Sequence, residues 1–349
     1  MKRTIGAVLI TAAASLPCQS ATSADLDRTT PIEITAHQIV LDPSKPDRKL
    51  VNGLIYRGGL ELSSGHKFFG GYSGLTVSPD GSKMIAISDR GTWLKADLIH
   101  ENGRLSGIAN AGVAPILGAN GKRLGVGYRD AEALATDPRG GFLISFEGQH
   151  RLNHYSVAPL PVGSMPALLA TPDGLSSAPL NKGLEAIVPL GARRYLLLTE
   201  DHRNDDLDTI GWILTHSHDR KSGSAAEISL AVSGLFHPTD AALLPDGDIL
   251  VLERRYMVLK GGSMRLRRIN SADVMPGTRL VGTTLGTITP PLTVDNMEGL
   301  AIRTDSDGKT LVYIMSDDNF KPGFGSLFLP SQRTLLMMFE LAVPKPVQR

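Results

Sequence analysis

The sequence predicts an all-β protein that folds as a single β-propeller. A segment of about 55 residues recurs along the chain, and each copy contains two β-rich runs joined by a turn. Each copy also places acidic residues at two fixed positions. No amphipathic helical pattern longer than two turns interrupts these repeats. Strand repeats of this length are typical of propeller blades, in which neighbouring sheets pack face to face around an axis.

The repeat is visible five times, in the ranges 71–91, 128–151, 181–203, 237–256 and 295–321. In each copy a first strand, such as LTVS or ALLP, leads into a turn such as PDG or PRGG. A second strand, such as MIAIS or YLLLT, follows the turn. Two β-rich runs joined by a short Pro/Asp/Gly turn predict a β-hairpin in every repeat.

The length of the chain divided by the repeat period predicts six blades. We expect the sixth blade to combine N-terminal strands at 32–41 and 54–62 with a C-terminal strand at 334–341. That pairing would close the ring and remove exposed sheet edges. A pair of β-sandwiches is the alternative fold, because regular short strands also suit sandwiches. The regular spacing of the acidic positions favours the propeller.

Two acidic positions recur in the repeats. At the first of them, the residues of successive copies are 53 to 58 residues apart in the chain. The first position holds Gly74, Glu132, Glu185, Asp240 and Glu298, and the second holds Asp89, Glu147, Glu200, Glu253 and Asp317. Equivalent positions of successive blades form rings around the axis, so we expect up to nine carboxylates at one end of the channel. Crowded carboxylates need solvation, basic partners or hard cations. Calcium takes several oxygen ligands in flexible geometry and suits carboxylates from different blades.

Basic residues follow the second acidic position in each repeat. They are Arg90, His150, Arg151, His202, Arg203, Arg254, Arg255 and Lys321. One interpretation is a network of salt bridges between neighbouring blades. The other is a site in which the basic residues bind an anion while metal ions bridge it to the carboxylates.

The motifs DAEALA, SFEGQHR, KGLEAI, PTDAALLPDGDILVLERRY, DNMEGLAI and SDDNF, in this order, resemble the phytase-like family, also called "esterase-like activity of phytase". The resemblance extends from about residue 50 to 341. It implies a propeller rich in Asp and Glu, with calcium-assisted hydrolysis of phosphoesters or phosphodiesters. Two positions depart from the family pattern: Gly74 replaces an acid, and Ala133 stands where the motif often has Gly.

On this resemblance we predict a hydrolase for a small anionic phosphate ester. The residues predicted to carry the reaction are Glu132, Glu185, Glu298, Arg151, Arg203 and Arg254, the arginines stabilising charge in the transition state. The residues predicted to bind Ca²⁺ are Asp89, Glu147, Glu200, Asp240, Glu253 and Asp317. Two alternatives stay open. One is a lactonase or other carboxylic-ester hydrolase with a single metal held by Asn181, Glu185 and Glu298, and the other is a non-enzymatic binding propeller with structural carboxylates.

The N-terminus has the pattern of a secretory signal. Lys2 and Arg3 precede an apolar run at 5–16, and small residues follow up to Ala24. We therefore predict a signal peptide at 1–24, a single propeller domain at 25–349, and a periplasmic or secreted product. The sole cysteine, Cys18, lies in the signal, which excludes disulfides and a cysteine nucleophile from the mature chain.

Other classes of protein fit the sequence poorly. The formal net charge of +1 argues against a general nucleic-acid binder. No stretch after the signal is both long and apolar enough to cross a membrane. We expect the protein to be a monomer. No GxSxG motif occurs, so a serine esterase is not expected.

Overall fold

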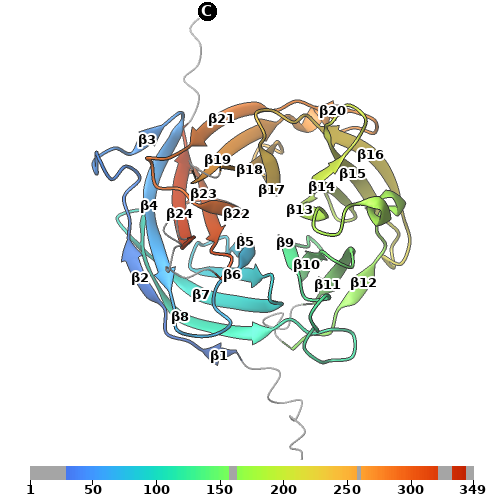
Figure 1. The fold of residues 1–349 in the computed structure, drawn as a ribbon, viewed down its shortest axis with the longest axis horizontal. Coiled ribbons are helices and arrows are strands. Elements are labelled where there is room, and N and C mark those ends of the chain that lie inside the picture. Colours follow the sequence, from blue (N-terminus) through green and yellow to red (C-terminus); the bar gives the residue numbers. More distant parts are fainter. Residues whose placement is uncertain (1–28, 157–162, 258–260, 321–331, 343–349) are drawn as a thin grey trace, which may run out of the picture.

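The computed structural model describes residues 29–156, 163–257, 261–320 and 332–342. These residues form five β-sheets that stand like blades around a central axis (Figure 1). The predicted all-β propeller is therefore confirmed. The predicted signal peptide and the basic residue Lys321 lie outside the described residues. Among the described residues, no helix has the length and apolar character needed to span a bilayer.

We number the blades by the order of their innermost strands. Blade 1 contains β1 (Thr30–Pro31), β5 (Tyr72–Val77), β6 (Lys83–Ser88), β7 (Thr92–Glu101) and β8 (Arg104–Pro115). Blade 2 contains β9 (Ala131–Thr136), β10 (Phe142–Phe146), β11 (Arg151–Tyr155) and β12 (Ala167–Leu169). Blade 3 contains β13 (Leu184–Pro189), β14 (Arg194–Arg203), β15 (Thr209–His216), β16 (Gly223–Leu230) and β20 (Arg279–Leu280).

Blade 4 contains β17 (His237–Leu243), β18 (Ile249–Met257), β19 (Gly261–Ile269) and β21 (Thr283–Ile288). Blade 5 contains β2 (Thr35–Gln38), β3 (Leu50–Val51), β4 (Leu54–Ser63), β22 (Asn296–Thr304), β23 (Thr310–Asp317) and β24 (Thr334–Leu341). Two short 3₁₀ helices, Asp173–Ser177 and Ser271–Asp273, lie in the connections.

The prediction of six blades is wrong, because the described residues form five. The N-terminal and C-terminal strands do pair, as predicted: β24 lies between β4 and β23, with Leu336 opposite Leu60 on one side and Met315 on the other. They do not form a separate sheet, however, since β23 pairs with β22 of the fifth repeat. The fifth repeat supplies only the two inner strands of its blade, and the terminal strands complete it.

The ring closes through its inner strands. Each of β5, β9, β13, β17 and β22 contacts the next, and β22 contacts β5. The second strands of the hairpins are apolar on both faces because each blade is covered on both sides by its neighbours. Tyr313 of blade 5, for example, is fully buried in a cluster with Tyr72 and Leu94 of blade 1. Burying such a side chain stabilises the fold by about 1.5–3 kcal/mol.

Candidate active site at the channel mouth

A β-bulge lies near the axis in every blade. In blade 3, Leu184 pairs with Thr199 and Ala186 pairs with Leu198, so Glu185 is an extra residue in its strand. The same shift occurs in the other inner strands. The residues at the bulges are Ser73, Glu132, Glu185, Thr239 and Glu298. A bulge redirects the side chain of the extra residue, and here it recurs at the first acidic position of the repeat.

The bulges correct the alignment of the first acidic position. Gly74 and Asp240 each lie one residue beyond the bulge, so the structural equivalents of Glu298 are Ser73 and Thr239. The sequence contains a signal for this in blade 1, because Ser73-Gly74 matches Glu298-Gly299 when the glycines are aligned.

The second acidic position is also shifted in blade 4. There Pro238, the residue before the bulge, pairs with Glu253. In the other blades, the residue before the bulge pairs with Ser88, Phe146, Thr199 or Ser316. The next residue, Arg254, therefore occupies the place that Asp89, Glu147, Glu200 and Asp317 occupy elsewhere. One cation interrupts the second ring of carboxylates.

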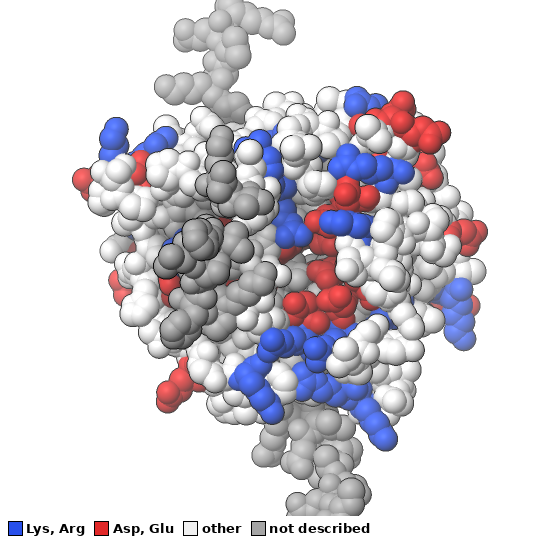
Figure 2. Space-filling model, viewed as in Figure 1, with Lys and Arg blue, Asp and Glu red and all other residues white. Residues whose placement is uncertain are grey.

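These positions surround a cavity of about 260 Å³. Its lining residues are Ser73, Asp89, Asp130, Glu132, Glu147, Asn181, Lys182, Glu185, Glu200, Arg254, Glu298, Asp317 and Asn319. Eight of them are carboxylates and two are cations. The space-filling view shows Asp and Glu gathered in the central hollow of the propeller (Figure 2). We call this cavity the acidic mouth.

The acidic mouth brings together eight of the twelve predicted residues: Glu132, Glu185, Glu298, Arg254, Asp89, Glu147, Glu200 and Asp317. It excludes Asp240, Glu253, Arg151 and Arg203. Asp130, Lys182, Ser73 and Asn319 line it without having been predicted. Asp130 was detectable, because it lies two residues before Glu132 in the YRDAEALA motif.

Asp240 and Glu253 are buried and hydrogen-bonded within the protein. The carboxylate of Asp240 accepts hydrogen bonds from the backbone N–H groups of Ala241, at 2.8 Å, and Leu300, at 2.7 Å. Glu253 is completely buried and forms ion pairs with Arg265 and Arg267, which are themselves buried. Both acids therefore connect elements of the fold and face away from the acidic mouth.

The two arginines outside the mouth are likewise held by the chain. Arg151 packs its guanidinium group 3.8 Å from the centroid of Phe146 and donates to the backbone carbonyl of Tyr128. Arg203 forms an ion pair with Asp201 and donates to the carbonyl of Leu207. Neither guanidinium group lines the cavity in which the carboxylates meet.

Arg254 neutralises one side of the acidic mouth. Its Nη2 lies 2.8 Å from Oε1 of Glu200, and its Nη1 lies 2.8 Å from Oε1 of Glu298. Nη1 also donates to Oδ1 of Asn296 at 2.6 Å. Lys182 reaches the other oxygen of Glu200 at 2.5 Å. The other six carboxylates that line the cavity form no ion pair with any described residue.

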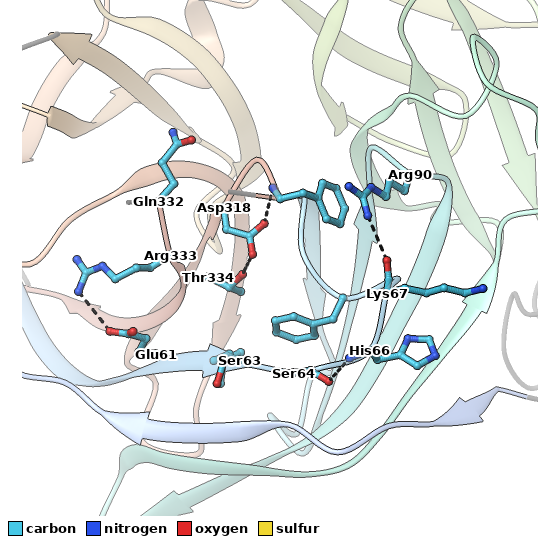
Figure 3. Close-up of a pocket in the computed structure, with 13 residues that line it drawn as sticks. Glu61, Ser63, Ser64, His66, Lys67, Arg90, Asp318, Gln332, Arg333 and Thr334 are labelled. Atoms are coloured by element: carbon cyan, nitrogen blue, oxygen red, sulfur yellow. Dashed lines mark hydrogen bonds and ion pairs between the residues drawn. The ribbon is translucent and has the colours of Figure 1, made fainter. Parts of the chain in front are cut away.

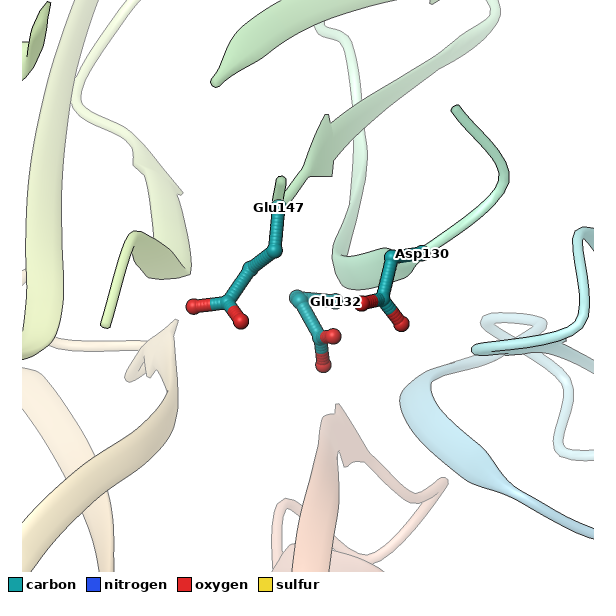
Figure 4. A group of neighbouring side chains, drawn as sticks. All are labelled: Asp130, Glu132 and Glu147. Carbon is teal, nitrogen blue, oxygen red and sulfur yellow. The ribbon is translucent and has the colours of Figure 1, made fainter. Parts of the chain in front are cut away.

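Three of these unpaired carboxylates lie close together. One oxygen each of Asp130, Glu132 and Glu147 lies within 4.8 Å of the others (Figure 4). Oxygen ligands from several carboxylates are the set that a hard cation such as Ca²⁺ prefers. The donor set and its lack of a basic partner therefore fit a calcium ion.

Burial and mutual repulsion raise the pKa values of the carboxylates. Burial, reinforced by Asp317 and Asp130, raises the pKa of Asp89 to about 7. Burial also raises the pKa of Glu147 to about 7. Glu132 has a pKa well above its usual range, first because its place in the cavity desolvates it and then because Glu147 and other acids surround it.

The blade 5 and blade 3 acids differ according to their partners. Burial raises the pKa of Glu298 to about 8 in spite of the opposing charge of Arg254. It raises the pKa of Asp317 to about 6. For Glu200, burial raises the pKa, but Arg254 and Lys182 outweigh it and hold the value below the usual range.

The raised pKa values predict that the metal-free protein loses stability as the pH rises. Between about pH 4 and pH 8 the folded state holds more protons than the unfolded state at Asp89, Glu147, Glu298 and Asp317, so the free energy of unfolding falls across this window. We expect a lower melting temperature at pH 8 than at pH 5 in the presence of a chelator, at constant ionic strength. A melting temperature that is flat or rises over this range would contradict the prediction.

A larger cavity lies nearby, between blades 5 and 1. It has a volume of about 410 Å³ and is lined by Glu61, His66, Arg90, Asp318, Arg333, Thr334 and their neighbours (Figure 3). Asp318 accepts hydrogen bonds from the hydroxyl of Thr334 and the backbone of Gly71, and Arg333 pairs with Glu61 at 3.3 Å. Its acids therefore already have partners, unlike most of those in the acidic mouth.

Comparison with known proteins gives one family and several structures. The family model described as "Esterase-like activity of phytase" matches residues 67–320. A gluconolactonase from Xanthomonas campestris is 11% identical, with 90% of this chain and 96% of that chain covered and a TM-score of 0.41. An endo-arabinase from Bacteroides thetaiotaomicron is 9% identical, with 77% and 93% covered and a TM-score of 0.44. A luciferin-regenerating enzyme is 9% identical, with 86% and 95% covered and a TM-score of 0.37. None of the curated proteins matches the sequence.

Proposed function

Because the chain belongs to the phytase-like family, we propose that it is a calcium-dependent hydrolase of phosphate esters or phosphodiesters that works at the acidic mouth. The observation that carries the proposal is the imbalance of charge there. Eight carboxylates and two cations line the cavity, and the two cations form ion pairs only with Glu200 and Glu298. Negative charge would repel a phosphate ester, so a bound cation is needed before such a substrate can enter. We further propose, from the N-terminal pattern, that the protein acts in the periplasm or outside the cell.

Asp130, Glu132 and Glu147 would hold the cation. A calcium ion bound there would polarise the phosphoryl oxygen and lower the pKa of an attacking water. Lys182 and Arg254 are the cationic side chains of the cavity and would contact the remaining phosphate oxygens. Arg254 is held by Glu200, Glu298 and Asn296, so its guanidinium group is oriented before the substrate arrives.

Glu185 is the best placed proton acceptor. It lines the acidic mouth, its side chain is buried, and it pairs with no basic residue among those described. Burial and the surrounding acids raise its pKa well above the usual range of a glutamate. A carboxylate with a raised pKa is a stronger base and suits the removal of a proton from water near neutral pH.

The proposal predicts that Ca²⁺ stabilises the protein and supports turnover. At a calcium concentration 100 times its dissociation constant, binding adds about 2.7 kcal/mol to the free energy of unfolding. We expect the melting temperature to rise when calcium replaces chelator, and release of 4-nitrophenol from bis(4-nitrophenyl) phosphate or 4-nitrophenyl phosphate to require calcium. Unchanged melting and no turnover with either substrate would contradict the proposal. Stabilisation without turnover would favour a binding propeller.

A single-metal lactonase is the second candidate. Asn181, Glu185 and Glu298, the residues expected to hold its metal, all line the acidic mouth. Metal analysis separates the two functions, because one tightly bound ion with turnover of lactones favours the lactonase. Hydrolysis of phosphate esters without hydrolysis of lactones excludes it.

A further inference from the structure

Another cavity, of about 470 Å³, lies between the loop that follows β8 and the outer part of blade 2. Its cationic lining residues are Lys122, Arg123 and Arg151, and no Asp or Glu is among the described residues that line it. In the space-filling view, Lys and Arg gather along the lower rim of the central hollow, next to the acidic patch (Figure 2). We call this cavity the basic pocket.

The positive charge of the basic pocket is not compensated. Within the described chain no carboxylate forms an ion pair with Lys122, Arg123 or Arg151, although most arginines of blades 3 and 4 have such partners. Partial burial, together with the nearby positive charge of Arg129, lowers the pKa of Arg123. Cations crowded in this way attract an anion from solution.

The guanidinium groups are held in place by aromatic rings. Arg123 lies 4.0 Å from the ring centroid of Phe68, and Arg151 lies 3.8 Å from that of Phe146. Arg151 also donates to the backbone carbonyls of Tyr128 and Gln149. Stacking fixes the planes of both groups, so that less side-chain entropy is lost when they bind a ligand.

Besides its cations and the amides of Asn120 and Asn153, the basic pocket is lined by apolar and aromatic side chains, some of which are open to solvent. Leu124, Pro166 and Leu168 line it, and so does Tyr128. The side chains of Leu168 and Tyr128 are 67% and 48% exposed. A cavity with apolar walls and a few convergent charged groups is the usual form of a site for a small organic molecule. Here the charges select an anion and the walls select an apolar body.

The backbone joins the basic pocket to the acidic mouth. Tyr128 lines the first, and Asp130, two residues later, lines the second. Two residues of extended chain span about 7 Å at most, which is within the length of one small substrate. The hydrogen bond from Arg151 to the carbonyl of Tyr128 holds this connecting segment against blade 2.

We propose that the basic pocket binds an organic anion with an apolar or aromatic body. Where the proposed hydrolase function holds, this anion is the part of the substrate that lies beyond the reacting phosphate. Small phosphate esters that lack such a part would then be poor substrates. The binding itself does not depend on the metal or on turnover, and it can be measured without either.

Isothermal titration calorimetry with 1-naphthyl phosphate in the presence of a chelator tests the binding. At pH 8 and without a cation, the ionised carboxylates of the acidic mouth repel the probe, so the heat reports on the basic pocket. We expect inorganic phosphate and 1-naphthol, which each carry half of the recognised chemistry, to bind at least about tenfold more weakly. The double variant Lys122→Ala, Arg123→Ala should also bind 1-naphthyl phosphate at least about tenfold more weakly, since it lacks two charge-assisted contacts.

Both substituted side chains are exposed, so the variant should remain folded. Lys49→Ala, at an exposed lysine of the loop before β3, is the matched control and should bind like the parent. Equal binding by parent and double variant, or equal binding of inorganic phosphate and the naphthyl ester, would overturn the proposal. Equal affinities of parent and double variant in the calorimeter count against the basic pocket alone. Absence of turnover in the parent counts against the proposed hydrolase.

Discussion

Glu132→Gln is expected to lower kcat/KM for a phosphodiester by about 100-fold or more in the presence of calcium. The substitution keeps the shape of the side chain and removes its charge from the group formed by Asp130, Glu132 and Glu147. The remaining two carboxylates would bind the cation more weakly and polarise the substrate less. Steady-state kinetics over a range of calcium concentrations would show a lower limiting rate and a higher calcium requirement.

Stability separates this effect from misfolding. Desolvation and then the neighbouring carboxylates raise the pKa of Glu132, so its neutral replacement should stabilise the metal-free protein at pH 8. Glu101→Gln, at an exposed position at the end of β7, is the matched control and should leave kinetics and melting unchanged. Activity of Glu132→Gln within twofold of the parent would show that Glu132 does not take part in the reaction.

Glu253→Gln is expected to lower the free energy of unfolding by about 3–5 kcal/mol. The substitution leaves Arg265 and Arg267 buried without their counter-charge, and such uncompensated charge is costly in the interior. Urea denaturation of parent and variant would measure the difference. Asp246→Asn is the control, since it breaks a partly exposed ion pair with Arg268, and such surface pairs are worth about 0–1 kcal/mol.

The same variant distinguishes a structural glutamate from a metal ligand. If Glu253 only pairs with the two arginines, its substitution destabilises the protein equally with calcium and with chelator. A loss that is seen only with calcium would instead support the role that the repeat pattern predicted for Glu253. Such a result would contradict a purely structural role of Glu253 as the partner of the two arginines.

Local patterns in the sequence determined much of the fold. The alternation of β-rich runs with Pro/Asp/Gly turns predicts the hairpins, because these turns and strands depend on residues close in the chain. Glu132, Glu185 and Glu298 were found for the same reason: each precedes a small residue and an apolar run in its repeat. Pairing of the chain termini was also foreseen, from the unpaired strands that the repeats left at either end.

Only the tertiary structure decided the number of blades and the composition of the acidic mouth. Repeat length does not reveal how outer strands are shared, so the terminal strands were assigned to a sixth blade and in fact complete the fifth. A shift of one residue turns a side chain to the other face of a strand, and repeat similarity alone did not locate the bulges. Glu253 was therefore predicted at the position that the pairing of β17 with β18 gives to Arg254. That single shift places a cation among the carboxylates, so that blade 4 alone contributes no carboxylate to the described lining of the acidic mouth.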